Sequence, residues 1–256
     1  MALPCRRLAF SLGWLPAAAA AILCAQIAPG RASSKVVSNP PNIEQLATGG
    51  LTDFEAKVRV VEADQEALAK INRDFGMAYR LKELTMRYKD PNKLRMDGTI
   101  GQLVVNGSQR WFRVPAIHLN KHDDLGDSPG KRYSLIDIGV LARSALHDMD
   151  CRYLRDERLD GAATFVFQLG YRGELSDRNR IWLDERTHLI DKREWLDNTG
   201  KVRATFLYQQ PKEVQPGLWF PTRVEILNGE NAVAAITSYD DLKVNQGLSD
   251  ALFDIS

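Results

Sequence analysis

Apolar and polar residues alternate with a period of two over most of residues 181–244. Residues 202–208 and 220–226 each repeat this pattern, which is typical of strands that bury one face. Between these runs lie residues 197–200 and 228–231, whose Asn and Gly residues favour tight hairpin turns. The pattern predicts an antiparallel meander that buries one face and can leave the other in water.

The same alternation predicts further strands before the meander. They are expected at residues 54–61, 77–89, 93–97, 102–105, 110–114 and 165–171. The pair Asn106-Gly107 predicts a hairpin between the fourth and fifth of these strands. Residues 118–131 are polar and contain Pro129-Gly130, so they predict a loop. We expect roughly ten or eleven strands in all, and a fold that is mainly β with a few helices.

Helical spacing appears in three places. Residues 43–47 predict a short helix, and residues 64–75 predict a second one with Asp64 as its N-cap and Gly76 as its stop. In residues 135–149 one face of a predicted amphipathic helix gathers the apolar side chains of Ile138, Leu141, Ala142, Ala145, Leu146 and Met149. This third helix interrupts the sheet sequence.

The N-terminus predicts export. Arg6 and Arg7 precede an apolar stretch at residues 8–23, so residues 1–32 are interpreted as a signal peptide cleaved after Ala32. An uncleaved membrane anchor and lipid attachment at Cys24 are the alternatives. Residues 33–50 predict a flexible lead-in, and residues 51–256 predict the folded domain. We therefore expect a periplasmic protein.

The charge balance of the chain limits the classes of partner that we expect. The chain has 256 residues with 34 basic and 33 acidic side chains, a net charge of +1. This near balance gives no electrostatic footprint for nucleic acid or an anionic membrane surface. Removal of the signal would leave Cys151 alone, which excludes an intramolecular disulfide. We interpret Cys151 as a small buried side chain rather than a reactive thiol.

Four segments carry a family resemblance: Tyr88-Lys-Asp-Pro-Asn-Lys-Leu-Arg-Met96, the hairpin at residues 104–115, residues 181–194, and residues 244–253. Together they resemble the LolA-like family of periplasmic outer-membrane lipoprotein carriers and sorting proteins, with its related sensor domains. The resemblance implies an unclosed antiparallel half-barrel whose concave apolar face is covered by helices that act as a lid. It also implies lipid or an acylated protein as cargo, a transport component of the inner or outer membrane as a partner, and no cofactor.

The chain departs from the family at one position. An arginine usually precedes the proline of the strand-end motif and gates the lid, but Asp90 precedes Pro91 here. Lys89 and Arg95 are the nearest cations. This departure weakens the inference of a lipoprotein carrier more than that of a lipid-binding half-barrel.

The candidate ligand-binding residues are apolar, as acyl chains require. The candidate pocket residues are Trp111, Trp182, Trp195, Phe206 and Trp219, and the candidate lid residues are Leu141 and Leu146. Each aromatic residue could instead belong to the core, and the helix could be packed permanently on the sheet.

One segment contains residue types that bind metal ions. His118 and His122 with Asp123 and Asp124 are ligand types, but their spacing suits a helix and the segment predicts a loop. The sequence shows no phosphate-cradling glycine loop, no Gly-x-Ser-x-Gly and no His-Glu-x-x-His. We therefore expect a carrier rather than an enzyme, with a ligand-sensing regulatory or interaction module of the same fold as the alternative.

Overall fold

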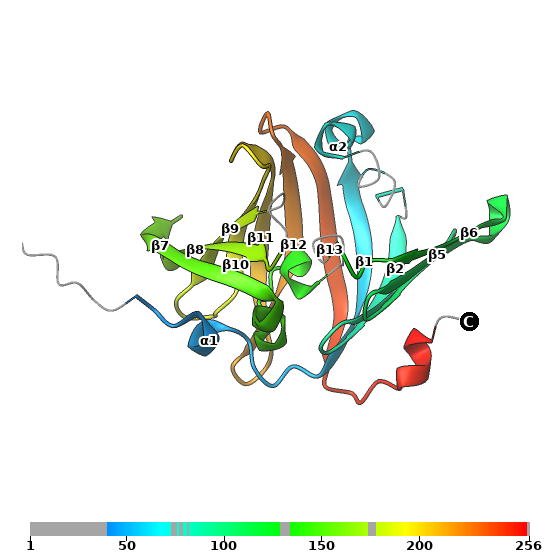
Figure 1. Cartoon of the computed structure of the whole chain (residues 1–256), viewed down its shortest axis with the longest axis horizontal. Coiled ribbons are helices and arrows are strands. Elements are labelled where there is room, and N and C mark those ends of the chain that lie inside the picture. Colours follow the sequence, from blue (N-terminus) through cyan, green and yellow to red (C-terminus); the bar gives the residue numbers. More distant parts are fainter. Residues whose placement is uncertain are drawn as a thin grey trace, which may run out of the picture. The chain divides into compact units, whose positions relative to one another are not determined.

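The computed structural model describes residues 40–72, 76, 79–80, 82–128, 134–173 and 178–254 (Figure 1). The expected signal peptide at residues 1–32 and residues 33–39 of the expected lead-in lie outside this part of the chain. No helix in the described ranges is long and apolar enough to cross a membrane.

The described strands form one antiparallel sheet of thirteen strands, which is not closed. Its order is β6-β5-β4-β3-β2-β1-β13-β12-β11-β10-β9-β8-β7, so every pair of neighbouring described strands is consecutive in sequence except β1 and β13. The strands are β1 (Asp53–Ala63), β2 (Glu83–Lys89), β3 (Lys93–Gly98), β4 (Gln102–Asn106), β5 (Gln109–Val114), β6 (Leu119–Asp124), β7 (Met149–Leu159), β8 (Ala162–Tyr171), β9 (Arg178–Asp184), β10 (Ile190–Leu196), β11 (Val202–Gln215), β12 (Leu218–Asn228) and β13 (Val233–Val244).

The mainly β, unclosed antiparallel fold that the sequence predicts is confirmed. Strands β9 to β13 pair in succession, as the meander requires. Strands β4 and β5 form the predicted hairpin, in which Gly107 adopts a φ of 63° that suits glycine. The expected ten or eleven strands are too few, because the described residues contain thirteen. The predicted loop at residues 118–131 is wrong in part, since β6 pairs with β5 from Leu119 to Asp124.

Two predicted α-helices are present and both are short. They are α1 (Ile43–Leu46) and α2 (Gln65–Ile71). The predicted N-cap is confirmed, because the Asp64 carboxylate accepts hydrogen bonds from the backbone N–H groups of Glu66 and Ala67 at 2.9 and 3.0 Å. Helix α2 ends at Ile71, earlier than predicted, and residue 75 lies outside the described residues.

The predicted amphipathic helix at residues 135–149 is wrong. Two 3₁₀ helices, η3 (Leu135–Ile138) and η4 (Arg143–Asp148), flank a short non-helical stretch at residues 139–142. Gly139 ends η3 with a φ of 85°. Beyond it, Val140 forms a bridge with Leu189 and Ala142 forms one with Thr48, so part of this backbone bonds to distant segments of the chain. We call residues 134–148 the inner segment.

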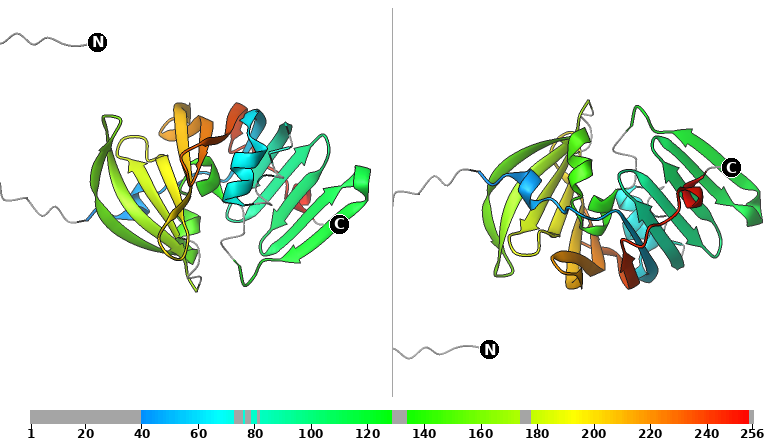
Figure 2. Two further views of the ribbon diagram at one scale, coloured as in Figure 1. Left: turned by 90° about the horizontal axis from the view of Figure 1, so that it is seen from above. Right: turned by 90° about the horizontal axis from the view of Figure 1, so that it is seen from below.

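Different segments of the chain pack on the two faces of the sheet. The sheet curves, and Figure 2 shows the inner segment within the curve, where it packs into the main core with α2. We call this side the concave face. Two other 3₁₀ helices are η1 (Pro115–Ile117) and η5 (Asp250–Phe253). Helix η5 lies against β3 on the opposite face, where Arg95 Nη1 donates to the Leu252 carbonyl at 2.9 Å.

Candidate functional site

One row of side chains crosses the concave face from β8 to β12. The strand register places Phe167, Ile181, Arg193, Phe206 and Ile226 opposite one another in succession. All five are buried, and four of them are apolar. The row is therefore an apolar surface with one cation at its centre.

The inner segment covers this surface with apolar side chains of its own. Its buried residues are Leu135, Ile136, Ile138, Val140, Leu141 and Ala142. The Tyr208 hydroxyl of β11 donates to the Ile136 carbonyl at 2.7 Å, and burial raises the pKa of Tyr208, so this donor keeps its proton. A Cβ at Gly139 would lie only 2.7 Å from the Tyr208 ring, so glycine is required for this close approach.

Arg193 joins the sheet to the inner segment. Its Nη2 atom lies 3.0 Å from Asp137 Oδ1 of η3, and its guanidinium lies 3.9 Å from the centroid of the Phe206 ring. Its Nε atom is buried and has no hydrogen-bond partner in the described structure. Burial opposes the charge, but Tyr208 and Asp137 outweigh burial and the pKa of Arg193 is raised. The side chain is thus a charged group inside the core.

A second polar contact holds the other end of the inner segment. Ser144 Oγ of η4 donates to Asp90 Oδ1 at 2.5 Å. The Tyr88 hydroxyl donates to the same Asp90 oxygen at 3.0 Å and also lies 2.9 Å from the Pro91 carbonyl oxygen. The residue that stands in place of the family's usual arginine therefore contacts the covering segment as an acceptor.

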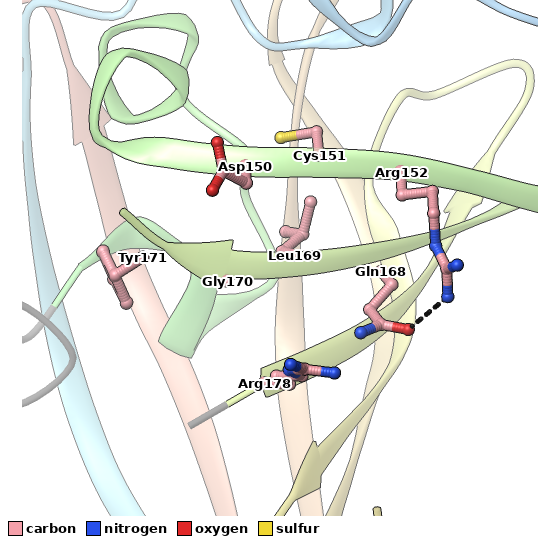
Figure 3. A pocket seen from close by; sticks show the side chains of 8 residues that line it. All are labelled: Asp150, Cys151, Arg152, Gln168, Leu169, Gly170, Tyr171 and Arg178. Atoms are coloured by element: carbon pink, nitrogen blue, oxygen red, sulfur yellow. Dashed lines mark hydrogen bonds between the residues drawn. The ribbon is translucent and has the colours of Figure 1, made fainter. Parts of the chain in front are cut away.

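A cavity of about 320 Å³ lies at the ends of β7, β8 and β9 (Figure 3). Its lining residues are Asp150, Cys151, Arg152, Gln168, Leu169, Gly170, Tyr171 and Arg178. Of these, Cys151, Leu169 and Tyr171 also pack in the main core, while Arg152 Nη2 donates to Gln168 Oε1 at 3.1 Å on its polar side. The cavity is therefore lined both by polar residues of the sheet edge and by residues that pack in or against the apolar core.

Cys151 has the properties of a buried side chain. It is half-buried, and burial raises the pKa of its thiol to about 11. At neutral pH the thiol keeps its proton and is a weak nucleophile.

The candidate pocket and lid residues fall on both faces of the sheet. Phe206 and Leu141 are in the main core, and Leu146, Trp195 and Trp219 pack against it. Trp182 follows Ile181 of the concave row, so it lies on the opposite face, under Lys192 Nζ at 4.3 Å.

Trp111 also lies on the opposite face. It pairs with Val104, the neighbour of the core residue Val105, and with His122 of β6. The alternation of side chains along the strands thus places the candidate aromatic residues on two different faces of the sheet. Sequence reasoning missed Arg193, because a charged residue in an alternating strand is typical of a solvent-facing position. It also missed the two groups that contact Arg193, Asp137 of η3 and Tyr208 of β11.

The histidine segment shows no shared centre. His118 ends η1 in a left-handed conformation, and His122 lies exposed on β6. Asp123 accepts from Arg110 Nη2 at 2.7 Å, and this hydrogen bond lowers the pKa of Asp123. Among the described residues no three His, Cys, Asp or Glu side chains are grouped so as to hold a metal ion.

The open antiparallel sheet with a chain segment over its concave face is a fold shared with solved structures, two of which are described as a lipoprotein-sorting domain and a LolA superfamily protein. One is a domain described as an outer-membrane lipoprotein-sorting protein from Vibrio parahaemolyticus, 15% identical, with a TM-score of 0.57 over 82% of this chain and 92% of that chain. A LolA superfamily protein from Nitrosomonas europaea is 15% identical, with a TM-score of 0.56 over 83% and 94% of the two chains.

A DUF1329 family protein from Desulfovibrio piger is similar to the same degree, at 14% identity and a TM-score of 0.58 over 83% of this chain and 92% of that chain. The model of a family described as "Uncharacterized protein" matches residues 99–256, more than half of the chain, and the chain belongs to this family. No curated protein matches the chain in sequence.

Proposed function

We propose that the protein is an exported, periplasmic carrier that binds lipid or the acyl chains of a lipoprotein on its concave face. The observation that carries this proposal is the inner segment, whose buried apolar side chains cover the row of strand residues from Phe167 to Ile226. A chain segment held there by a few polar contacts can exchange with an acyl chain, since both offer the same apolar contact. The likeness to a lipoprotein-sorting domain and a LolA superfamily protein supports the same class of ligand.

Competition between cover and cargo makes release possible. Burial of an acyl chain of about sixteen carbons could contribute about 12 kcal/mol before ordering costs, which alone would hold the cargo too tightly for a carrier. Displacing the inner segment subtracts the free energy of its own burial from that gain. The cavity beside Cys151, Leu169 and Tyr171 gives the exchanging chain a route from the sheet edge to the core.

This function needs no catalytic centre, and the proposal includes none. The proposal includes the signal peptide at residues 1–32, the lead-in at residues 33–50 and the folded domain at residues 51–256. It also includes a membrane transport component as the donor or acceptor of cargo, and no nucleic acid.

Acyl-probe binding by the exported protein tests the function. Protein recovered from the periplasm should begin at Ser33, bind a neutral fluorescent acyl ester with saturation, and carry lipid adducts in native mass spectra. A folded protein that shows neither adducts nor probe binding contradicts the carrier and favours the sensor or interaction module. Protein retained at full length in the inner membrane, or acylated at Cys24, contradicts the export route.

A further inference from the structure

The concave row contains one charge, and its partner comes from the covering segment. Arg193 is flanked across the strands by Ile181 and Phe206, and it is 8% exposed. The ion pair to the guanidinium comes from Asp137, which belongs to η3 and not to a strand. The sheet therefore presents the cation, and the inner segment supplies the anion.

A buried arginine that loses its counter-ion is strongly unfavourable. If the inner segment leaves the concave face, Asp137 leaves with it, and the guanidinium loses its carboxylate partner but keeps its neighbours on β11, the Phe206 ring and Tyr208. The buried Nε, which has no hydrogen-bond partner in the described structure, and the Nη2 now paired with Asp137 would both face the vacated surface. A planar guanidinium with two N–H groups on one edge fits a carboxylate or a phosphate in a two-point contact.

We infer that Arg193 binds the anionic head group of the cargo, and that Asp137 occupies this position as an intramolecular substitute while the face is covered. This inference rests on the proposed function and narrows its ligand to an anionic amphiphile. The acyl chain takes the place of the apolar side chains of the inner segment, and the carboxylate or phosphate takes the place of Asp137. Replacement of Asp137 by the head group at Arg193 is thereby coupled to replacement of the apolar side chains by the acyl chain along the row.

Three variants separate this role from a structural one. Arg193→Gln removes the cation. Asp137→Asn removes the competing charge and keeps an oxygen that can accept from the Ser134 N–H, a bond of 2.9 Å in the wild type. Asp123→Asn is the matched control, because it removes a carboxylate from an arginine pair of similar length, 2.7 Å to Arg110, on the distant strands β5 and β6.

The measurement is displacement of a neutral fluorescent acyl ester at pH 8 by palmitate, methyl palmitate and palmitoyl lysophosphatidic acid, each below its micelle concentration. Wild type should bind an anionic ligand at least tenfold more tightly than methyl palmitate. Asp137→Asn should increase this ratio several-fold, Asp123→Asn should leave it unchanged, and Arg193→Gln should reduce it to near one. A preference for palmitate or for lysophosphatidic acid distinguishes a carboxylate from a phosphate cargo.

The opposite results are equally clear. Equal binding of palmitate and methyl palmitate by wild type, or an unchanged ratio in Asp137→Asn, overturns the inference and leaves the carrier function standing. The Asp137→Asn result decides the matter even if Arg193→Gln does not fold. Failure of all three ligands to bind folded wild type overturns the proposed function and this inference together.

Discussion

The Ser144 hydroxyl donates to Asp90 Oδ1 across 2.5 Å, which ties η4 of the inner segment to the turn between β2 and β3. The contact joins two parts of the chain that lie 54 residues apart. The acceptor, Asp90, directly precedes Pro91 of the strand-end motif. The inner segment is therefore fixed at both ends, by Asp90 near η4 and by Arg193 near η3.

Ser144→Ala should loosen the cover with a small loss of stability. One hydrogen bond to a carboxylate is lost, which should lower the free energy of unfolding by about 1–2 kcal/mol. If the inner segment competes with cargo, apparent affinity for the acyl ester should rise at the same time. Ser238→Ala, which removes an exposed 3.3 Å contact to Asp240 within β13, is the control for both measurements. Weaker ester binding by Ser144→Ala would argue against competition.

Gly139→Ala tests the close approach of the inner segment to β11. The added Cβ would lie 2.7 Å from Tyr208 Cδ1 at a φ of 85°, so the inner segment must shift away from the sheet. We expect a loss of about 2–4 kcal/mol in urea unfolding, from backbone strain and overpacking together. Acyl-ester affinity should rise.

Gly161→Ala supplies the matched control for backbone strain. Gly161 has a φ of 89°, but no atom outside its neighbours lies within 4 Å of the Cβ position. This variant should lose about 1–2 kcal/mol through strain alone and bind the ester as wild type does. An equal change of affinity in both variants would show that general destabilisation, rather than the cover, controls binding.

The sequence predicts the sheet well where strands are half-buried and poorly at the edges. β6 and β7, the two edge strands, are the ones that the alternation failed to predict. Charged side chains such as Lys121, Arg152 and Arg155 lie on them, and charge on an edge protects the sheet from pairing with other chains while it obscures the apolar period.

The candidate site is harder to predict, because it depends on register. Arg193 stands between Lys192 and Glu194, and all three side chains are charged. The alternation alone therefore does not show whether Arg193 or its two neighbours face the core. The inner segment was predicted as one helix for another reason. Leu141 and Ala142 are both buried, as in a helix, but Gly139 breaks the helix and the neighbouring chain satisfies the backbone. The spacing of apolar residues there shows which side chains are buried, but it does not determine the backbone conformation.

Asp191 of β10 should make stability depend on pH. Burial, followed by the nearby charges of Asp184 and Asp160, raises the pKa of Asp191 from 3.8 to about 7. Between about pH 4 and pH 7 the unfolded chain loses this proton while the folded chain keeps it, so the free energy of unfolding falls as pH rises. The loss is complete above the folded-state pKa.

Asp191→Asn should therefore be more stable than wild type at pH 8, by roughly 1–2 kcal/mol because solvent screens a half-buried group. The two proteins should converge at about pH 4, with urea unfolding at both pH values as the measurement. Asp240→Asn, at an exposed position of β13, is the control. A wild type that gains stability between pH 5 and pH 8 relative to Asp191→Asn would show that Asp191 is not destabilised by its charge.

Leu141→Ser and Leu146→Ser decide whether the inner segment is a lid or a permanent part of the core. Leu141 is fully buried, whereas Leu146 is half-buried and packs at the margin of the core. Truncation of a buried leucine costs about 2–5 kcal/mol, so Leu141→Ser should lose more stability than Leu146→Ser. A lid gives higher affinity for the acyl ester in both single variants and the highest in the double variant, because each change raises the population of the open state. A permanent core segment gives lower stability with unchanged or weaker binding, and titration of the ester at a temperature where every variant is folded separates the two outcomes.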